Sequence, residues 1–216
     1  MKPFQNADGG VIMSVREYDI ATSTAIKVGQ VVKLSGGKVV SAIAAETGAI
    51  LGIAAENHSG SADPLNPRSN GTKIMVYDSP HLVMQCPAPQ VTATGGSATT
   101  FVSTSLAAFS DDDLNGGYIK LVAKGSSSTN TDEIGAVREI TDHAGSTKTL
   151  TVPTGGTICS GDVYEIYPPL GFGKGNLDTN IQKLVLTATA SLPLKVVQNK
   201  REGNIGLMAS SHAFAN

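Results

Sequence analysis

The feature that most restricts the fold of this chain is a succession of short apolar runs separated by turn residues. At least ten such runs occur, spaced as the strands of hairpins are. The one helix candidate, residues 104–114, is too short to change the fold class, and no other segment has a convincing helical apolar period. The sequence therefore predicts an all-β protein.

The clearest hairpin is expected near the start of the chain. Val28–Leu34 is a β-branched run, and Lys38–Ile43 is a second one. Between them lie Ser35, Gly36 and Gly37, and paired glycines supply the positive φ that tight hairpin turns require. Further strands are expected at residues 49–55, 72–77 and 81–86, with a turn at 78–80 and a long loop at 57–71.

Prolines and glycines mark the two ends of a central part of the chain that has its own pattern of strands. Pro87 and Pro89 lie at its start, and Pro168-Pro169 and the glycine-rich Gly171–Gly175 lie at its end. Inside it, the strand around Arg138 is expected to pair with the strand around Lys148 across a turn at 142–145, with 163–167 beside them. The predicted architecture has three parts: an extended N-terminal arm (1–24), a small discontinuous β-barrel (25–89 plus 176–216) and an inserted β domain (90–175).

Composition narrows the function classes. The 216 residues include 16 Lys and Arg against 18 Asp and Glu, and the net charge is −2. A near-neutral balance argues against a general nucleic-acid binder, which needs a basic face. A hydrophobic content of 40% argues against disorder. The first residues lack the apolar region of a signal peptide, and no apolar run approaches the roughly 20 residues of a membrane span. We therefore expect synthesis in a cytoplasm and neither a nucleic-acid nor a membrane partner.

Two glycine-containing motifs invite functional interpretations. Asp111-Asp112-Asp113-Leu114-Asn115-Gly116 matches the first half of a calcium loop, but the twelfth position holds Val122 instead of a carboxylate. An acidic turn is the favoured interpretation, and cation binding stays open. Gly171–Gly175 resembles a phosphate loop, but two prolines precede it and neither Ser nor Thr follows Lys174. We interpret it as a flexible connection.

Histidines and cysteines show no catalytic or metal-binding spacing. His58, His81, His143 and His212 are scattered, and surface polar roles are expected for His58 and His143. Cys86 and Cys159 form no CxxC pattern and are expected to be buried free thiols. The sequence has no Gly-x-Ser-x-Gly elbow. We expect no enzyme activity and predict no catalytic residue, cofactor or metal ligand.

The central block resembles a β module that recurs in tailed-bacteriophage virion proteins. The resemblance rests on a "G-x-x-R-x-I-x-D" strand and turn at 135–142, a threonine-rich strand at 147–152 and a "Y-x-I" strand at 164–166. Residues 28–32 and 50–54 are similar to small-barrel capsid decoration, or cement, proteins. The ending, residues 194–214, resembles the last strands of virion β proteins.

The resemblance implies a decoration protein on the outer capsid surface, commonly a homotrimer, whose partner is the major capsid protein. It carries no transferable catalytic residues. A head-fibre or tail receptor-binding module is the alternative, and a β-barrel enzyme is a third. Candidate capsid or subunit contacts are Lys2, Phe4, Val11, Met13, Arg16, Tyr18, His58 and Arg68.

Overall fold

The computed structural model describes residues 1–6, 14–21, 24–59, 71–178, 183–199 and 201–214. These residues form nineteen strands in antiparallel sheets and contain no helix, so the predicted all-β class is confirmed. The helix candidate at 104–114 is wrong, because those residues form turns. Within the described ranges, no helix has the length and apolarity to cross a membrane.

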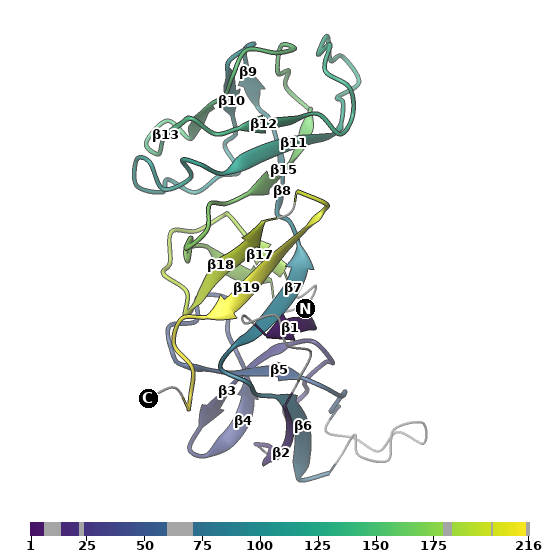
Figure 1. Cartoon of the computed structure of the whole chain (residues 1–216), viewed down its shortest axis with the longest axis vertical. Coiled ribbons are helices and arrows are strands. Elements are labelled where there is room, and N and C mark those ends of the chain that lie inside the picture. The colour runs from purple at the N-terminus through teal and green to yellow at the C-terminus, as the bar shows by residue number, and fades with distance from the viewer. Residues whose placement is uncertain (7–13, 22–23, 60–70, 179–182, 200, 215–216) are drawn as a thin grey trace.

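A five-stranded sheet, here called the lower sheet, occupies one end of the molecule (Figure 1). The predicted hairpin with its Gly36-Gly37 turn is confirmed, and the two glycines have φ of 56° and 78°. In spatial order the strands are β2 (Val15–Asp19), β6 (Lys73–Tyr77), β5 (Ile50–Ala54), β3 (Val31–Ser35) and β4 (Lys38–Ser41).

The lower sheet curls until its two edges approach. Ile20, just after β2, forms a one-residue parallel bridge with Val39 of β4, and the Ala21 amide donates to the Val39 carbonyl at 3.1 Å. The curl encloses a small apolar core of its own, made of Ile20, Ile26, Val32, Val39, Leu51, Ala54, Ile74 and Val76.

A four-stranded sheet, here called the middle sheet, lies above the lower one (Figure 1). Its strands in spatial order are β1 (Lys2–Asn6), β7 (Leu82–Pro87), β19 (Asn204–Ala209) and β18 (Leu194–Asn199). A two-stranded sheet, β16 (Asn176–Asp178) with β17 (Lys183–Val185), accompanies it. The residues expected to build one barrel thus form separate sheets, and the described part of the chain contains no closed barrel.

The segment expected to be an N-terminal arm supplies two of these strands. β1 pairs with β7 in the middle sheet, and β2 pairs with β6 in the lower sheet. The N-terminal amine donates to the Gly29 carbonyl at 2.9 Å. The described parts of this segment therefore lie across their own chain.

The central block forms the upper part of the molecule from two further sheets (Figure 1). One has the order β12 (Val137–Glu139), β11 (Tyr118–Ala123), β15 (Val163–Tyr167), β8 (Gln90–Thr92). The other has the order β13 (Asp142–Ala144), β14 (Thr149–Thr151), β10 (Thr100–Val102), β9 (Gly95–Gly96).

Two local expectations within the block are wrong. The strand around Arg138, β12, pairs with β11 and not with the strand around Lys148. Residues 142–144 form β13, which pairs with β14, so the turn lies after Ala144. β15, in turn, pairs with β11 and β8.

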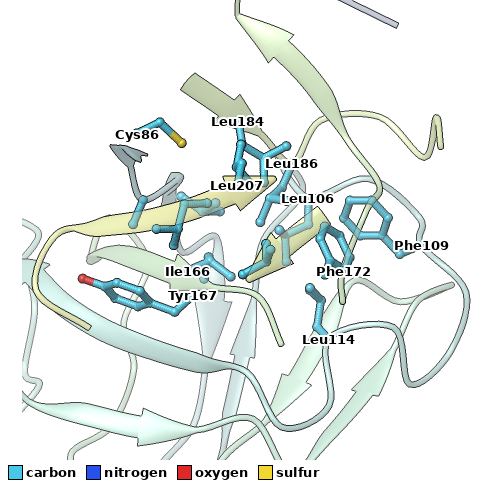
Figure 2. Packing of buried hydrophobic residues seen from close by; sticks show 14 of the residues in the cluster. Cys86, Leu106, Phe109, Leu114, Ile166, Tyr167, Phe172, Leu184, Leu186 and Leu207 are labelled. Carbon is cyan, nitrogen blue, oxygen red and sulfur yellow. The ribbon is translucent and has the colours of Figure 1, made fainter. Parts of the chain in front are cut away.

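One apolar core connects the central block to the middle sheet. Figure 2 shows Phe109, Tyr167 and Phe172 packed in the same cluster as Leu186 and Leu207. Phe109 and Phe172 meet edge to face, with ring centroids 5.6 Å apart. Pro89, Pro168 and Phe172, in the two segments that join the central block to the middle sheet, are buried, whereas Pro87 and Leu170 in the same segments are exposed. These two segments are therefore partly packed against the core.

Candidate interaction surface

The predicted contact residues fall into three groups. Lys2 and Phe4 lie exposed on β1, and Arg16 and Tyr18 lie on β2. His58 follows β5 and is buried. The remaining three, Val11, Met13 and Arg68, lie outside the described residues.

The structure joins Arg16 and Tyr18 through a third residue, Asp78. The Tyr18 hydroxyl donates to Asp78 Oδ2, and Arg16 Nε lies 3.4 Å from the same oxygen. Asp78 is buried, whereas the Arg16 side chain is 68% exposed. Burial and the hydrogen bond to Asp78 raise the pKa of Tyr18 to about 12, so the hydroxyl stays protonated and keeps donating.

The C-terminal segment completes this surface. Phe214 is 52% exposed and stacks on Tyr18, with ring centroids 6.3 Å apart. The segment is fixed by the buried His212, whose Nε2 lies 2.8 Å from the Leu51 carbonyl oxygen and whose Nδ1 accepts from the Phe214 amide at 3.1 Å. We call Arg16, Tyr18, Asp78 and Phe214 the β2 patch. Sequence reasoning missed Asp78 and Phe214, because they come from a turn and a chain end far from β2.

His58 is a structural residue and not a surface contact. Its ring nitrogens face the carbonyl oxygens of Thr24 at 2.9 Å and Gly71 at 2.8 Å. The His58 amide donates to the Ile26 carbonyl, and the Ile26 amide donates back. The imidazole thereby connects three segments of the lower part, and the expected surface role of this side chain is wrong.

Large apolar side chains are exposed in several parts of the molecule, among them Phe4 on β1 and Leu170 after β15. Val15, Val28, Ile43 and Phe214 belong to the segments in and around the lower sheet. Ile134 and Val137 lie in the central block, and Val137 is on the edge strand β12. Such residues are normal when scattered, but gathered apolar surface marks contact sites.

The acidic turn at 111–113 is occupied by protein partners. Asp113 forms an ion pair with Lys174 at 2.6 Å, and Asp111 accepts from the Gly145 amide at 2.8 Å. Among the residues that the structure describes, no group of three or more His, Cys, Asp or Glu side chains is arranged to hold a metal ion. The ion pair between Lys174 and Asp113 connects the glycine-rich segment 171–175 to the acidic turn.

His143 lies beside this turn and is also buried, contrary to the expected surface role. It is only 1% exposed, and within the described part of the chain neither ring nitrogen forms a hydrogen bond of normal geometry, although the Ser110 backbone lies near enough to favour the protonated ring. Phe109 contacts the ring from one side. Burial lowers the pKa of His143 below its ordinary value, although the carboxylates of Asp113, Asp111 and Asp142 oppose this shift.

The neutral, buried state of His143 predicts acid sensitivity. Because the folded pKa is below the unfolded one, the unfolded state takes up the proton first, and stability falls as pH drops below about 6.5. His143→Phe should lose less stability between about pH 7.5 and pH 5 than the wild type does, as measured by urea unfolding. The control is the exposed His81→Gln. Equal pH dependence in His143→Phe and the wild type would contradict this prediction.

The two cysteines differ in environment. Cys86 is buried as expected, and burial raises the pKa of its thiol to about 11. Cys159 is half-buried, contrary to the expectation, and hydrogen bonds from Thr129 lower the pKa of its thiol. Both are free thiols.

Comparison with known proteins adds no relative: no family model matches the chain, and neither the curated proteins nor the solved structures contain a significant match.

Proposed function

We propose that this chain is a capsid decoration protein of a tailed bacteriophage, which binds the outer surface of the head and stabilises the shell by bridging capsomers. The observation that carries the proposal is that four large apolar side chains, Val15, Val28, Ile43 and Phe214, are exposed in segments of and around the lower sheet, which lies at one end of the long axis (Figure 1). Exposed apolar side chains beside a charged rim, here Arg16, suit contact with another protein surface.

In this proposal the lower sheet faces the shell. The central block, with residues 90–175 as an inserted domain, lies at the opposite end of the long axis and points outward (Figure 1). The partner is the major capsid protein. A bound partner stabilises the assembled shell by mass action, and the repeated lattice multiplies weak contacts through avidity. We further propose a homotrimer, in which symmetric contacts cover exposed strand edges.

Co-sedimentation with heads that lack the protein tests the shell contact. Phe214→Ser should weaken binding about tenfold, since truncating a central aromatic contact often costs more than 1 kcal/mol. Ile134→Ser, at the opposite end, is the matched control and should bind like the wild type. If Ile134→Ser loses binding and Phe214→Ser does not, the orientation is wrong.

The exposed Ile134 and Val137 favour a second candidate, a head-fibre or tail receptor-binding module that uses the central block. Cryo-microscopy of the virion distinguishes the two functions. Trimeric density spread over the head supports decoration, whereas density confined to a fibre or tail supports the alternative. Light scattering that gives a stable monomer at micromolar concentration, with monomeric density on the particle, would contradict the trimer.

A further inference from the structure

A groove of about 380 Å³ lies where the β18–β19 hairpin meets the central block. Its lining includes Tyr118 of β11, Leu170 after β15, and Val197, Gln198 and Arg201 of the hairpin. The volume lies within the range of small-molecule sites. The described residues of its lining include a single charged side chain, Arg201, and no carboxylate.

Arg201 is an exposed cation that lies over an aromatic ring. Its guanidinium carbon lies 3.7 Å from the centroid of the Tyr118 ring, a cation–π contact. Among the described residues, Arg201 forms no ion pair with a carboxylate. Its φ is 58°, which is unfavourable for a residue with a long side chain. Strained residues of this kind gather at ligand sites, and the unpaired donors of the guanidinium suit an anion.

The other walls combine apolar and amide groups. Leu170, which is 68% exposed, and Val197 are the apolar lining residues of the groove outside the Tyr118 ring. Gln198 contributes an amide that can donate and accept. The neighbouring Asn199 fixes the hairpin against the central block, because its Nδ2 donates to the carbonyls of Tyr167 at 3.2 Å and Pro168 at 2.9 Å.

The backbone of Val196, next to the groove, is already paired. The Val196 amide donates to the Phe172 carbonyl, and the Gly171 amide donates to the Val196 carbonyl, each at 2.8 Å. β11 lies between β12 and β15 and has no open edge. An extended peptide that adds a strand would need such an edge. β18 is the edge strand of the middle sheet, but its backbone at Val196 is bonded to Gly171 and Phe172, and we therefore infer recognition by side chains.

We propose that this groove binds a carboxylated sugar residue. The carboxylate would pair with the Arg201 guanidinium, ring hydroxyls would bond the Gln198 amide and the Tyr118 hydroxyl, and the apolar face of the ring would contact Leu170 and Val197. This site goes beyond the proposed function, because the proposed shell contact is at the lower sheet.

Isothermal titration and NMR of the full chain with glucuronic acid and N-acetylneuraminic acid test the site. Both acids should bind, whereas glucose and the methyl ester of glucuronic acid should bind at least about tenfold more weakly, since they lack the charge. Arg201→Asn should weaken binding of the acids about tenfold, and asparagine tolerates the left-handed backbone. Leu170→Ser, at an exposed position, should weaken it as well.

The matched control is Arg16→Gln, which removes an exposed arginine from the β2 patch and should leave sugar binding unchanged. Three results would overturn the proposal: neither acid binds, glucose binds as well as the acids do, or Arg201→Asn and Leu170→Ser both bind like the wild type. A short acidic peptide that binds more tightly than both sugars would also overturn it. None of these results bears on head binding, which Phe214→Ser tests separately.

Discussion

Replacing Arg138 by alanine is expected to lower the free energy of unfolding by about 3–5 kcal/mol, the usual cost of breaking a buried ion pair from one side. Arg138 is only 8% exposed and forms an ion pair with Asp132. Its guanidinium also donates to the carbonyls of Ala98 at 3.0 Å and Gly156 at 2.6 Å. Alanine would leave one carboxylate and two carbonyls without these donors.

Two matched variants separate the ion pair from simple loss of volume. Arg138→Met combined with Asp132→Leu removes both charges and should recover part of the loss, since apolar replacement of a buried pair is often neutral or favourable. Arg16→Ala removes a largely exposed arginine and should cost about 0–1 kcal/mol. Urea unfolding followed by circular dichroism measures all of these. An Arg138→Ala protein as stable as the wild type would show that this pair contributes nothing.

Arg138 also shows which structural features a local sequence pattern can predict and which it cannot. The motif that contains it, residues 135–142, was recognisable as a strand, and its apolar member Ile140 is fully buried. The space for the guanidinium depends on Gly155, where a Cβ atom would lie 2.4 Å from Arg138 Cζ. No pattern around Arg138 predicts that contact, which comes from a loop seventeen residues further on.

The lower hairpin was predictable because all of its information is local. Two β-branched runs and the pair Gly36-Gly37 determine both the turn and the register. The pairing of β12 with β11 was not predictable, because more than one antiparallel arrangement of the same strands satisfies the same alternation of apolar residues. The expected turn at 142–145 failed for a related reason. His143 looks like a turn residue in sequence, but its side chain is buried beside Phe109.

The candidate surface was predictable only in part. Arg16 and Tyr18 are among the candidate contacts predicted from the sequence, and both lie on β2. Their connection through Asp78 and the stacking of Phe214 on Tyr18 depend on contacts between residues that lie 60 or more positions apart in the sequence. His58 failed as a contact because the backbone carbonyls that bury it come from Thr24 and Gly71, on either side of it in the chain.

The largest expected effect concerns the central block as a whole. The sequence predicts that joining Pro89 to Asn176 through a short Gly/Ser linker leaves a folded protein. The shared core reverses this expectation. Removing 90–175 would expose apolar side chains of the middle sheet that Figure 2 shows packed against the central block. It would also delete seventeen members of the cluster, among them Leu106, Phe109, Leu114, Ile166, Tyr167 and Phe172.

Burying one large apolar side chain contributes roughly 1.5–3 kcal/mol, and a domain has about 5–15 kcal/mol in total. Leaving the apolar side chains of the middle sheet without these packing partners should therefore abolish cooperative unfolding, and thermal melts followed by circular dichroism should show no transition. Phe172→Ala tests the same core in the full chain and should cost about 3–5 kcal/mol while leaving the protein folded. If the joined protein melts cooperatively near the wild-type temperature and Phe172→Ala costs less than about 1 kcal/mol, the block and the middle sheet have separate cores.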